Sequence, residues 1–176
     1  MKKVIAKCKL SSRERFEEKL AEIDLDFSPV YWQHDRVYAP RGYKRGMNLP
    51  RLVMRTEMHA VDKPAKHYLI LRRHIESSGV DVVEQTLVTD YEETVKIILQ
   101  LGFKSIAEVS RRRQDLKMGE GTYIYLDKIE NQAGYFAKIE SELGEDDSVE
   151  EAKADLEKTF KTLGESHLME TAYEEL

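Results

Sequence analysis

The sequence predicts a single α+β domain over residues 1–176, with mostly antiparallel strands forming either a closed barrel or a strongly curved sheet. Two observations carry this prediction. Strand-like runs with period-two alternation, about eight in all, are separated by short turns, which favours hairpins and antiparallel pairing. Helical patterns lie after the first strand, near the middle and at the end of the chain, which indicates helices packed outside one sheet.

The first half begins with a strand and a helix. Apolar residues from Val4 to Leu10 alternate with lysines, so this strand has one apolar and one largely basic face. Ser11 with Glu14 matches a capping box, which predicts a helix to about Ile23. Further strands are predicted over residues 27–39, 52–61, 67–74 and 80–88, separated by a loop at 40–50 and turns at 62–65 and 77–79.

The second half repeats this order. Thr89 with Glu92 matches another capping box, and the helix that it opens ends at Gly102. Strands are predicted over residues 103–113, 122–128 and 135–142. Ser148 is expected to cap an acidic helix to about Leu163, and residues 169–176 are expected to form a short helix.

Composition limits the classes of protein and the compartment. Of the 176 residues, 41% are hydrophobic and 35% are charged, as in a soluble globular domain. Because no apolar run approaches ~18 residues and no signal peptide is evident, we expect no membrane partner. The single Cys8 cannot form an internal disulfide, so a cytoplasmic location is predicted. The net charge of −5 makes nucleic acid an unexpected partner.

Basic residues gather on one face of the predicted strands. If that face lines a cavity, its arginines and lysines suit a polyphosphate, because both side chains bind phosphate oxygens. The alternative is that they are exposed on one side of an open sheet. The predicted triphosphate-binding residues are Lys7, Lys9, Arg55, Arg72, Arg111, Arg113 and Lys138. Fewer acidic residues accompany them: Glu84, Asp127 and Glu140.

Several motifs resemble a known family. The triplet Arg111-Arg112-Arg113 is similar to a K-K-R segment, and residues 126–140 are similar to an L-D-x-V … G-x-F-x-E-I-E ending. Residues 171–176 are similar to an S-Y-x-x-L close. These motifs belong to the CYTH family of triphosphate tunnel enzymes, which includes class IV adenylyl cyclases, thiamine triphosphatases and inorganic triphosphatases. The resemblance covers most of the chain and is strongest over residues 90–140.

The resemblance implies a fold, a ligand and a metal. Its fold is a closed barrel of eight antiparallel strands, the triphosphate tunnel, with helices packed outside. Its ligands are triphosphate-containing small molecules or inorganic polyphosphate, and its chemistry uses Mg²⁺ or Mn²⁺. The residues that match its metal-binding acids are Glu140, Glu84 and Asp127. Its cyclase-like members also imply a homodimer.

The chain departs from the family where metal is bound. The opening E-x-E-x-K signature aligns with residues 3–7, where Lys3 and Ile5 replace both glutamates and Lys7 keeps the lysine. In the last strand, Lys138 replaces the first glutamate of E-I-E and Glu140 keeps the second. Lysines in a basic cavity favour an anion over a cation. We therefore expect a phosphate-rich anion to bind with Mg²⁺ or Mn²⁺ not required, and metal-dependent catalysis to be weakened or lost.

Two alternatives remain open from the sequence. One is an active Mg²⁺- or Mn²⁺-dependent triphosphatase or class IV adenylyl cyclase with Glu140, Glu84 and Glu57 as ligands. The other is a non-enzymatic module that binds RNA or a protein, since aromatic and basic residues mix in residues 31–45. Its candidate residues are Tyr31, Trp32, Tyr38 and Tyr43 with Arg36, Arg41, Lys44 and Arg45.

Overall fold

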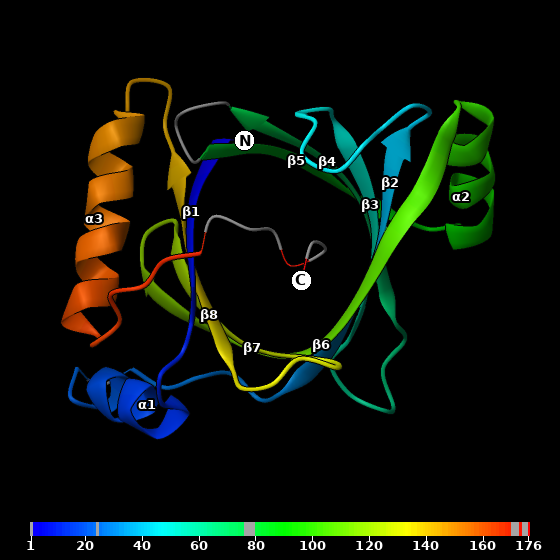
Figure 1. Ribbon diagram of the computed structural model, residues 1–176. Helices are drawn as coiled ribbons and strands as arrows, with labels where there is room; N and C mark the ends of the chain where they lie inside the picture. Colours follow the sequence, from blue (N-terminus) through cyan, green and yellow to red (C-terminus); the bar gives the residue numbers. More distant parts are fainter. Residues whose placement is uncertain (1, 24, 76–79, 170–172, 174–175) are drawn as a thin grey trace.

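The protein is described here by a computed structural model that covers residues 2–23, 25–75, 80–169, 173 and 176, and in this part eight strands and three helices are present (Figure 1). The predicted turn at 77–79 and most of the predicted helix at 169–176 lie outside the described residues. None of the described helices is long and apolar enough to cross a membrane. The elements in chain order are β1 (Lys2–Lys9), α1 (Arg13–Ala21), β2 (Tyr31–Pro40), β3 (Arg51–Met58), β4 (Lys66–Ile75), β5 (Val80–Val88), α2 (Tyr91–Gln100), β6 (Phe103–Gly119), β7 (Thr122–Ile129), β8 (Phe136–Leu143) and α3 (Val149–Thr162).

The strands pair antiparallel in a ring with the order β1-β5-β4-β3-β2-β6-β7-β8, and β8 pairs back to β1. The β1–β8 pairing joins eight residue pairs, whereas the β1–β5 pairing that completes the ring joins only three, from Lys2 to Val4. The predicted eight antiparallel strands with helices outside are therefore confirmed. The sheet is strongly curled and its ring closes through this short β1–β5 seam.

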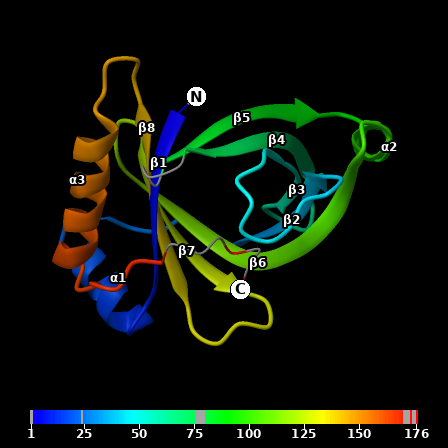
Figure 2. The same ribbon diagram turned by 45° about the horizontal axis from the view of Figure 1, so that its top comes forward.

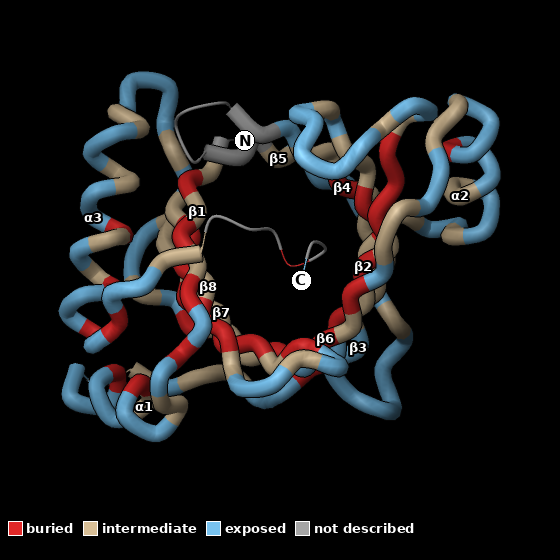
Figure 3. The backbone as a smooth tube through the Cα atoms, viewed as in Figure 1, coloured by how far each residue is buried: buried red, intermediate tan, exposed pale blue. Residues whose placement is uncertain are grey.

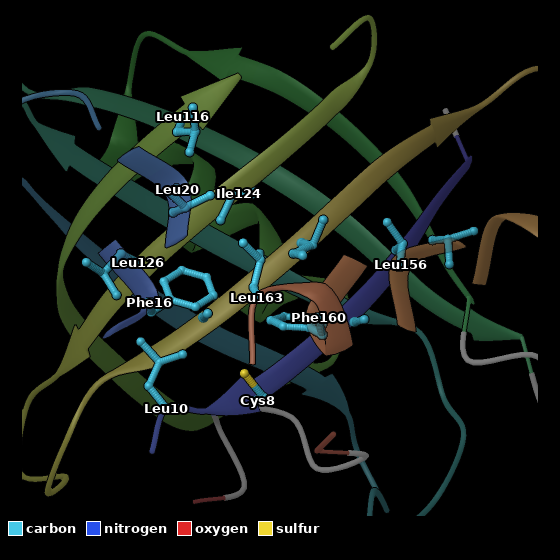
Figure 4. Close-up of a cluster of buried hydrophobic side chains, with 14 residues drawn as sticks. Cys8, Leu10, Phe16, Leu20, Leu116, Ile124, Leu126, Leu156, Phe160 and Leu163 are labelled. Carbon is cyan, nitrogen blue, oxygen red and sulfur yellow. The ribbon is translucent and has the colours of Figure 1, made fainter. Parts of the chain in front are cut away.

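The main core lies outside the ring, where α1 and α3 cover the apolar face of β1, β6, β7 and β8 (Figures 1 and 4). Phe16 and Leu20 of α1 and Leu156 and Phe160 of α3 are all buried there. Burying one such side chain contributes about 1.5–3 kcal/mol. In Figure 3 the buried stretches follow the strands, and the outer turns of the helices are exposed.

A second outer cluster lies beneath α2, across the ring from α1 and α3 in both views of the ribbon (Figures 1 and 2). Ile98 of α2 packs against Tyr38 of β2 and Met54 of β3. Helices cover the outer face of the ring at both places. The opposite face of the strands points to the inside of the ring, and the space that this inner face surrounds is called the tunnel below.

The helix starts differ by one residue from two of the three predictions. Ser12 caps α1 by accepting from the Arg15 N–H, and Asp90 caps α2 by accepting from the Glu93 N–H. Ser11, the predicted first cap, instead donates its hydroxyl to Glu165 at 3.0 Å. The third cap, Ser148, is confirmed.

Strand β6 continues to Gly119, beyond its predicted end at Arg113, because it keeps pairing with β7 through Lys117. The β6–β7 hairpin then turns at Gly121, whose φ of 70° lies in the left-handed region that favours glycine.

Cys8 is fully buried in the main core, and burial is the largest cause that raises the pKa of its thiol to about 12. The thiolate is the reactive form of cysteine. We therefore expect the native protein to react with a thiol reagent such as DTNB at least a hundredfold more slowly than the urea-unfolded chain. A stopped-flow comparison of the two rates measures this, and equal rates would contradict the buried position of Cys8.

Candidate functional site

The predicted anion-binding residues share the inner face of the ring. Directly paired residues in an antiparallel sheet place their side chains on the same side. Lys7 pairs with Lys138, and Lys138 pairs with Tyr125, on the face opposite the core under α1 and α3. The same register places all of the predicted triphosphate-binding residues in the tunnel: Lys7, Lys9, Arg55, Arg72, Arg111, Arg113 and Lys138.

Asp35 of β2 holds two arginines of neighbouring strands. Arg55 binds it through two parallel hydrogen bonds of 2.7 and 2.9 Å, and Arg111 donates to it at 2.5 Å. Arg111 also donates to Gln33, which in turn donates to Glu57 at 2.7 Å. Burial alone would raise the pKa of Asp35, but Arg111 and Arg55 hold it well below its ordinary value. Asp35 is therefore a buried anion that fixes the geometry of both guanidinium groups.

Asp127 of β7 is paired with Arg113 of β6 in the same way. Two hydrogen bonds of 2.6 and 2.7 Å join them, and their side chains are 0% and 3% exposed. The Arg113 guanidinium also lies 4.4 Å from the centre of the Tyr125 ring. Burial acts to raise the pKa of Asp127, but Arg113 outweighs it and lowers that pKa. Neither oxygen of this carboxylate is thus left without a strong donor.

Glu140 of β8 lies between two lysines, Lys3 of β1 and Lys138 of β8. Its Oε1 accepts from Lys3 at 2.9 Å and from the Tyr125 hydroxyl at 2.8 Å, while its Oε2 accepts from Lys138 at 2.6 Å. Burial opposes ionisation of Glu140, but Lys138 and Lys3 keep its pKa well below the ordinary range. The ammonium groups therefore occupy the positions around this carboxylate that a cation would take.

Lys138 itself is strongly affected by its place. Burial, and to a smaller extent the charge of Arg113, lowers the pKa of its ammonium group to about 7, although Glu140 acts to raise it. Its Nζ lies 4.3 Å from the centre of the Tyr125 ring. The low pKa of Lys138 thus reflects mainly the loss of water around its amine, and a bound anion would favour the charged form.

Tyr173, near the C-terminus, also lies in the tunnel. Its ring packs edge-on against Phe136 with centroids 5.8 Å apart, and Lys7 and Arg111 each lie 5.7 Å from it. The buried hydroxyl has no hydrogen-bond partner within the described residues, and burial, with Asp127 nearby, raises its pKa well above the ordinary value. Tyr173 therefore places a neutral hydroxyl among the cations of the inner face.

The predicted metal ligands are not brought together. Glu84 pairs in register with Leu71 on the outer face of the ring, is 58% exposed and contacts Arg73 at 3.3 Å, so the prediction that it faces the tunnel is wrong. Glu57 does lie in the tunnel, where it accepts from Gln33. Among the described residues, no group of three or more His, Cys, Asp or Glu side chains is placed to hold a metal ion.

Mg²⁺ and Mn²⁺ prefer carboxylate and water oxygens. Here both oxygens of Glu140 bind lysines or a tyrosine, and those of Asp127 and Asp35 bind arginines. The residues present therefore do not fit the metal site that the family resemblance implies.

The residues proposed for an RNA- or protein-binding module do not form one surface. Tyr31 pairs with Arg113 and is buried in the tunnel, whereas Tyr38 is buried outside, beneath α2. Trp32 lies on the outer face and is 50% exposed, and Arg36 is paired with Glu108 at 2.7 Å. Tyr31, Trp32 and Tyr38 are thus divided between the two faces of β2, and Tyr43 lies in the loop that follows it.

Comparison with known proteins identifies the fold. No protein-family model and no curated protein matches the sequence. Among solved structures, a Pyrococcus horikoshii protein is 22% identical, with a TM-score of 0.83 over 97% of this chain and 95% of that chain. A putative adenylate cyclase from Vibrio parahaemolyticus is 16% identical, with a TM-score of 0.80 over 98% and 95%.

A putative adenylyl cyclase from Hippeastrum, described as having a dominant triphosphatase activity, is 17% identical, with a TM-score of 0.61 over 98% of this chain and 91% of that chain. With the ring of eight strands, these likenesses define a class: the fold is the triphosphate tunnel fold of CYTH-type proteins. The fold that the motifs in residues 90–140 implied is confirmed.

Proposed function

We propose that the tunnel binds a phosphate-rich anion, either a triphosphate-containing small molecule or inorganic polyphosphate, without requiring a divalent metal. The observation that carries this proposal is the placement of Lys3 and Lys138 on the two oxygens of Glu140. These lysines supply at the carboxylate the positive charge that a metal supplies in other proteins of this fold. Metal-dependent catalysis is then weak or absent.

The charge balance of the tunnel supports the same proposal. Asp35, Asp127 and Glu140 together bind five side-chain cations, Arg55, Arg111, Arg113, Lys3 and Lys138, so these three clusters carry a net positive charge. A phosphate group brings roughly one to two negative charges at neutral pH. A triphosphate therefore compensates several of these cations at once.

Titration calorimetry with tripolyphosphate tests the proposal. We expect tripolyphosphate to bind in EDTA with a Kd within about threefold of its Kd in excess Mg²⁺. Strict dependence of binding on Mg²⁺ would contradict metal-free recognition. Phosphate release from tripolyphosphate, thiamine triphosphate and ATP with Mg²⁺ or Mn²⁺ measures turnover, and rapid release would favour the alternative of an active triphosphatase.

Anion binding should also take up a proton. Because the pKa of Lys138 is about 7, its amine is mostly neutral at pH 8 in the free protein, and a bound anion favours the charged form. At pH 8 the unchanged chain should therefore take up roughly one proton more on binding than Lys138→Met, in which only the ligand's phosphates and other groups titrate, and at pH 6 the two should exchange nearly equal numbers of protons. Calorimetry at pH 8 in two buffers of different ionisation enthalpy measures the uptake.

The matched control for proton uptake is Lys138→Met, which removes the titrating amine. If this variant binds more weakly but still takes up the same proton, another group titrates and the assignment to Lys138 is wrong.

A further inference from the structure

A hollow on the outer face of the ring lies apart from the tunnel. It is formed where the start of α1 and the loop after β7 meet the outer face of β6 and β7. The enclosed space measures only about 70 Å³, well below the roughly 300–1,000 Å³ of a complete small-ligand site, so the hollow encloses a single group such as a phosphate and leaves the rest of a ligand on the surface. Its lining residues are Arg13, Val30, Arg112, Gln114, Leu126, Lys128 and Tyr135.

Two cations face each other across this hollow. Arg112 of β6 pairs directly with Lys128 of β7, so their side chains leave the sheet side by side. Like charges at directly opposed positions of an antiparallel pair destabilise the sheet unless an anion lies between them. Lys128 is held there by hydrogen bonds from its Nζ to the backbone oxygens of Gln132 at 2.8 Å and Gly134 at 3.0 Å.

Acidic compensation is sparse at the hollow. Among the described residues, Arg112 contacts no carboxylate, and its guanidinium lies 5.9 Å from the centre of the Trp32 ring. Arg13, the third cation, is paired with Glu17 at 2.9 Å and also donates to the Tyr135 hydroxyl at 3.0 Å. The lining therefore keeps a net positive charge.

An aromatic surface adjoins these cations. Trp32 pairs with Arg112 on the same outer face and is 50% exposed, and the Arg112 guanidinium lies over one side of its ring. Val30 and Leu126 are the aliphatic residues of the lining. Cations beside an exposed aromatic ring match a ligand that joins a phosphate to a planar ring.

We propose that this hollow binds a phosphate monoester carrying an aromatic ring, such as a nucleoside monophosphate. Its phosphate lies between Arg112 and Lys128, within reach of Arg13, and its ring stacks on Trp32. The site is separate from the tunnel, because Arg112 lies on the face of β6 opposite Arg111 and Arg113. The proposal does not rest on the function proposed for the tunnel.

The chain contains a single tryptophan, Trp32, so its fluorescence reports on this site alone. The experiment titrates the full chain with AMP, ribose 5-phosphate and adenosine. Parallel titrations of free tryptophan correct for the light that each compound absorbs. We expect AMP to quench the fluorescence of Trp32 saturably and to bind more tightly than ribose 5-phosphate or adenosine alone. Arg112→Gln should weaken AMP binding at least tenfold, which is the loss expected for one charge-assisted hydrogen bond.

The control variant is Arg72→Gln in the tunnel, which should leave the AMP titration unchanged, while Arg112→Gln should leave tripolyphosphate calorimetry unchanged. Circular dichroism checks that both variants fold. Failure of AMP to quench Trp32 saturably would overturn the proposal, as would equal AMP affinity in Arg112→Gln and the unchanged chain. A loss of AMP binding in Arg72→Gln, with Arg112→Gln unaffected, would place AMP in the tunnel and also overturn it.

Discussion

Replacing Lys138 with glutamate is expected to weaken metal-free tripolyphosphate binding at least about a hundredfold. The change places a carboxylate beside Glu140, in contact with Tyr125, where an ammonium group now lies. The variant lacks one of the cations proposed to bind the anion, and its new carboxylate repels the anion. Because the variant restores two neighbouring acids in β8, Mg²⁺ should then recover part of the lost affinity. Calorimetry in EDTA and in Mg²⁺ measures both effects.

The matched control is Lys158→Glu, which makes the same change of charge on an exposed position of α3, outside the ring. It should alter tripolyphosphate affinity less than threefold. Similar losses in the two variants would mean that net charge alone governs binding. Binding by Lys138→Glu that is unchanged in EDTA would show that Lys138 does not contact the anion.

The second large effect is expected on stability. Asp127→Asn should lower the free energy of unfolding by about 3–5 kcal/mol, because it leaves the buried Arg113 guanidinium without its counter-charge. For a domain of this size, the melting temperature should fall by roughly 10 °C. Urea unfolding and thermal melts measure the loss, and Asp146→Asn in an exposed loop is the control.

Tripolyphosphate should stabilise Asp127→Asn more than it stabilises the unchanged chain, because the freed Arg113 becomes a further partner for the anion. A melting temperature of Asp127→Asn within 2–3 °C of the control, or roughly 1 kcal/mol, would show that the pair is not structurally important.

Much of the fold is predictable from local sequence. Period-two alternation from Val4 to Leu10 and the turn glycines locate the strands, and the motifs in residues 90–140 indicate the barrel. The helix caps are shifted by one residue because Ser11 and Ser12, like Thr89 and Asp90, are neighbouring good caps, and tertiary contacts such as that of Ser11 with Glu165 decide between them. The extension of β6 to Gly119 depends on its partner strand, which local patterns do not reveal.

The site, too, is predictable only where local alternation of residues along a strand reveals it. The basic residues alternate visibly along each strand, so the tunnel-facing arginines and lysines are found from sequence. Their partner Asp35 was missed because it is placed by the β2–β6 pairing, which joins strands far apart in the chain. Glu84 was assigned to the wrong face because a shift of one residue reverses the direction of every side chain in a strand.

Tyr125 and Tyr173 were also missed as site residues. Tyrosine in a strand or near a chain end most often packs in a core, so the sequence alone does not distinguish a donor to Glu140 from an ordinary aromatic residue. For Tyr125, the alternation with Asp127 in β7 was an available signal, since both residues lie on the inner face.

The most direct test of metal-free anion recognition is a crystal structure of the chain soaked with tripolyphosphate and Mn²⁺, with anomalous data for manganese. We predict phosphate density between Lys7, Lys138 and the tunnel arginines, Lys3 and Lys138 still bound to Glu140, and no manganese peak at that carboxylate. A manganese ion bound to Glu140, with the two lysines displaced and the triphosphate coordinated through the metal, would contradict the central claim.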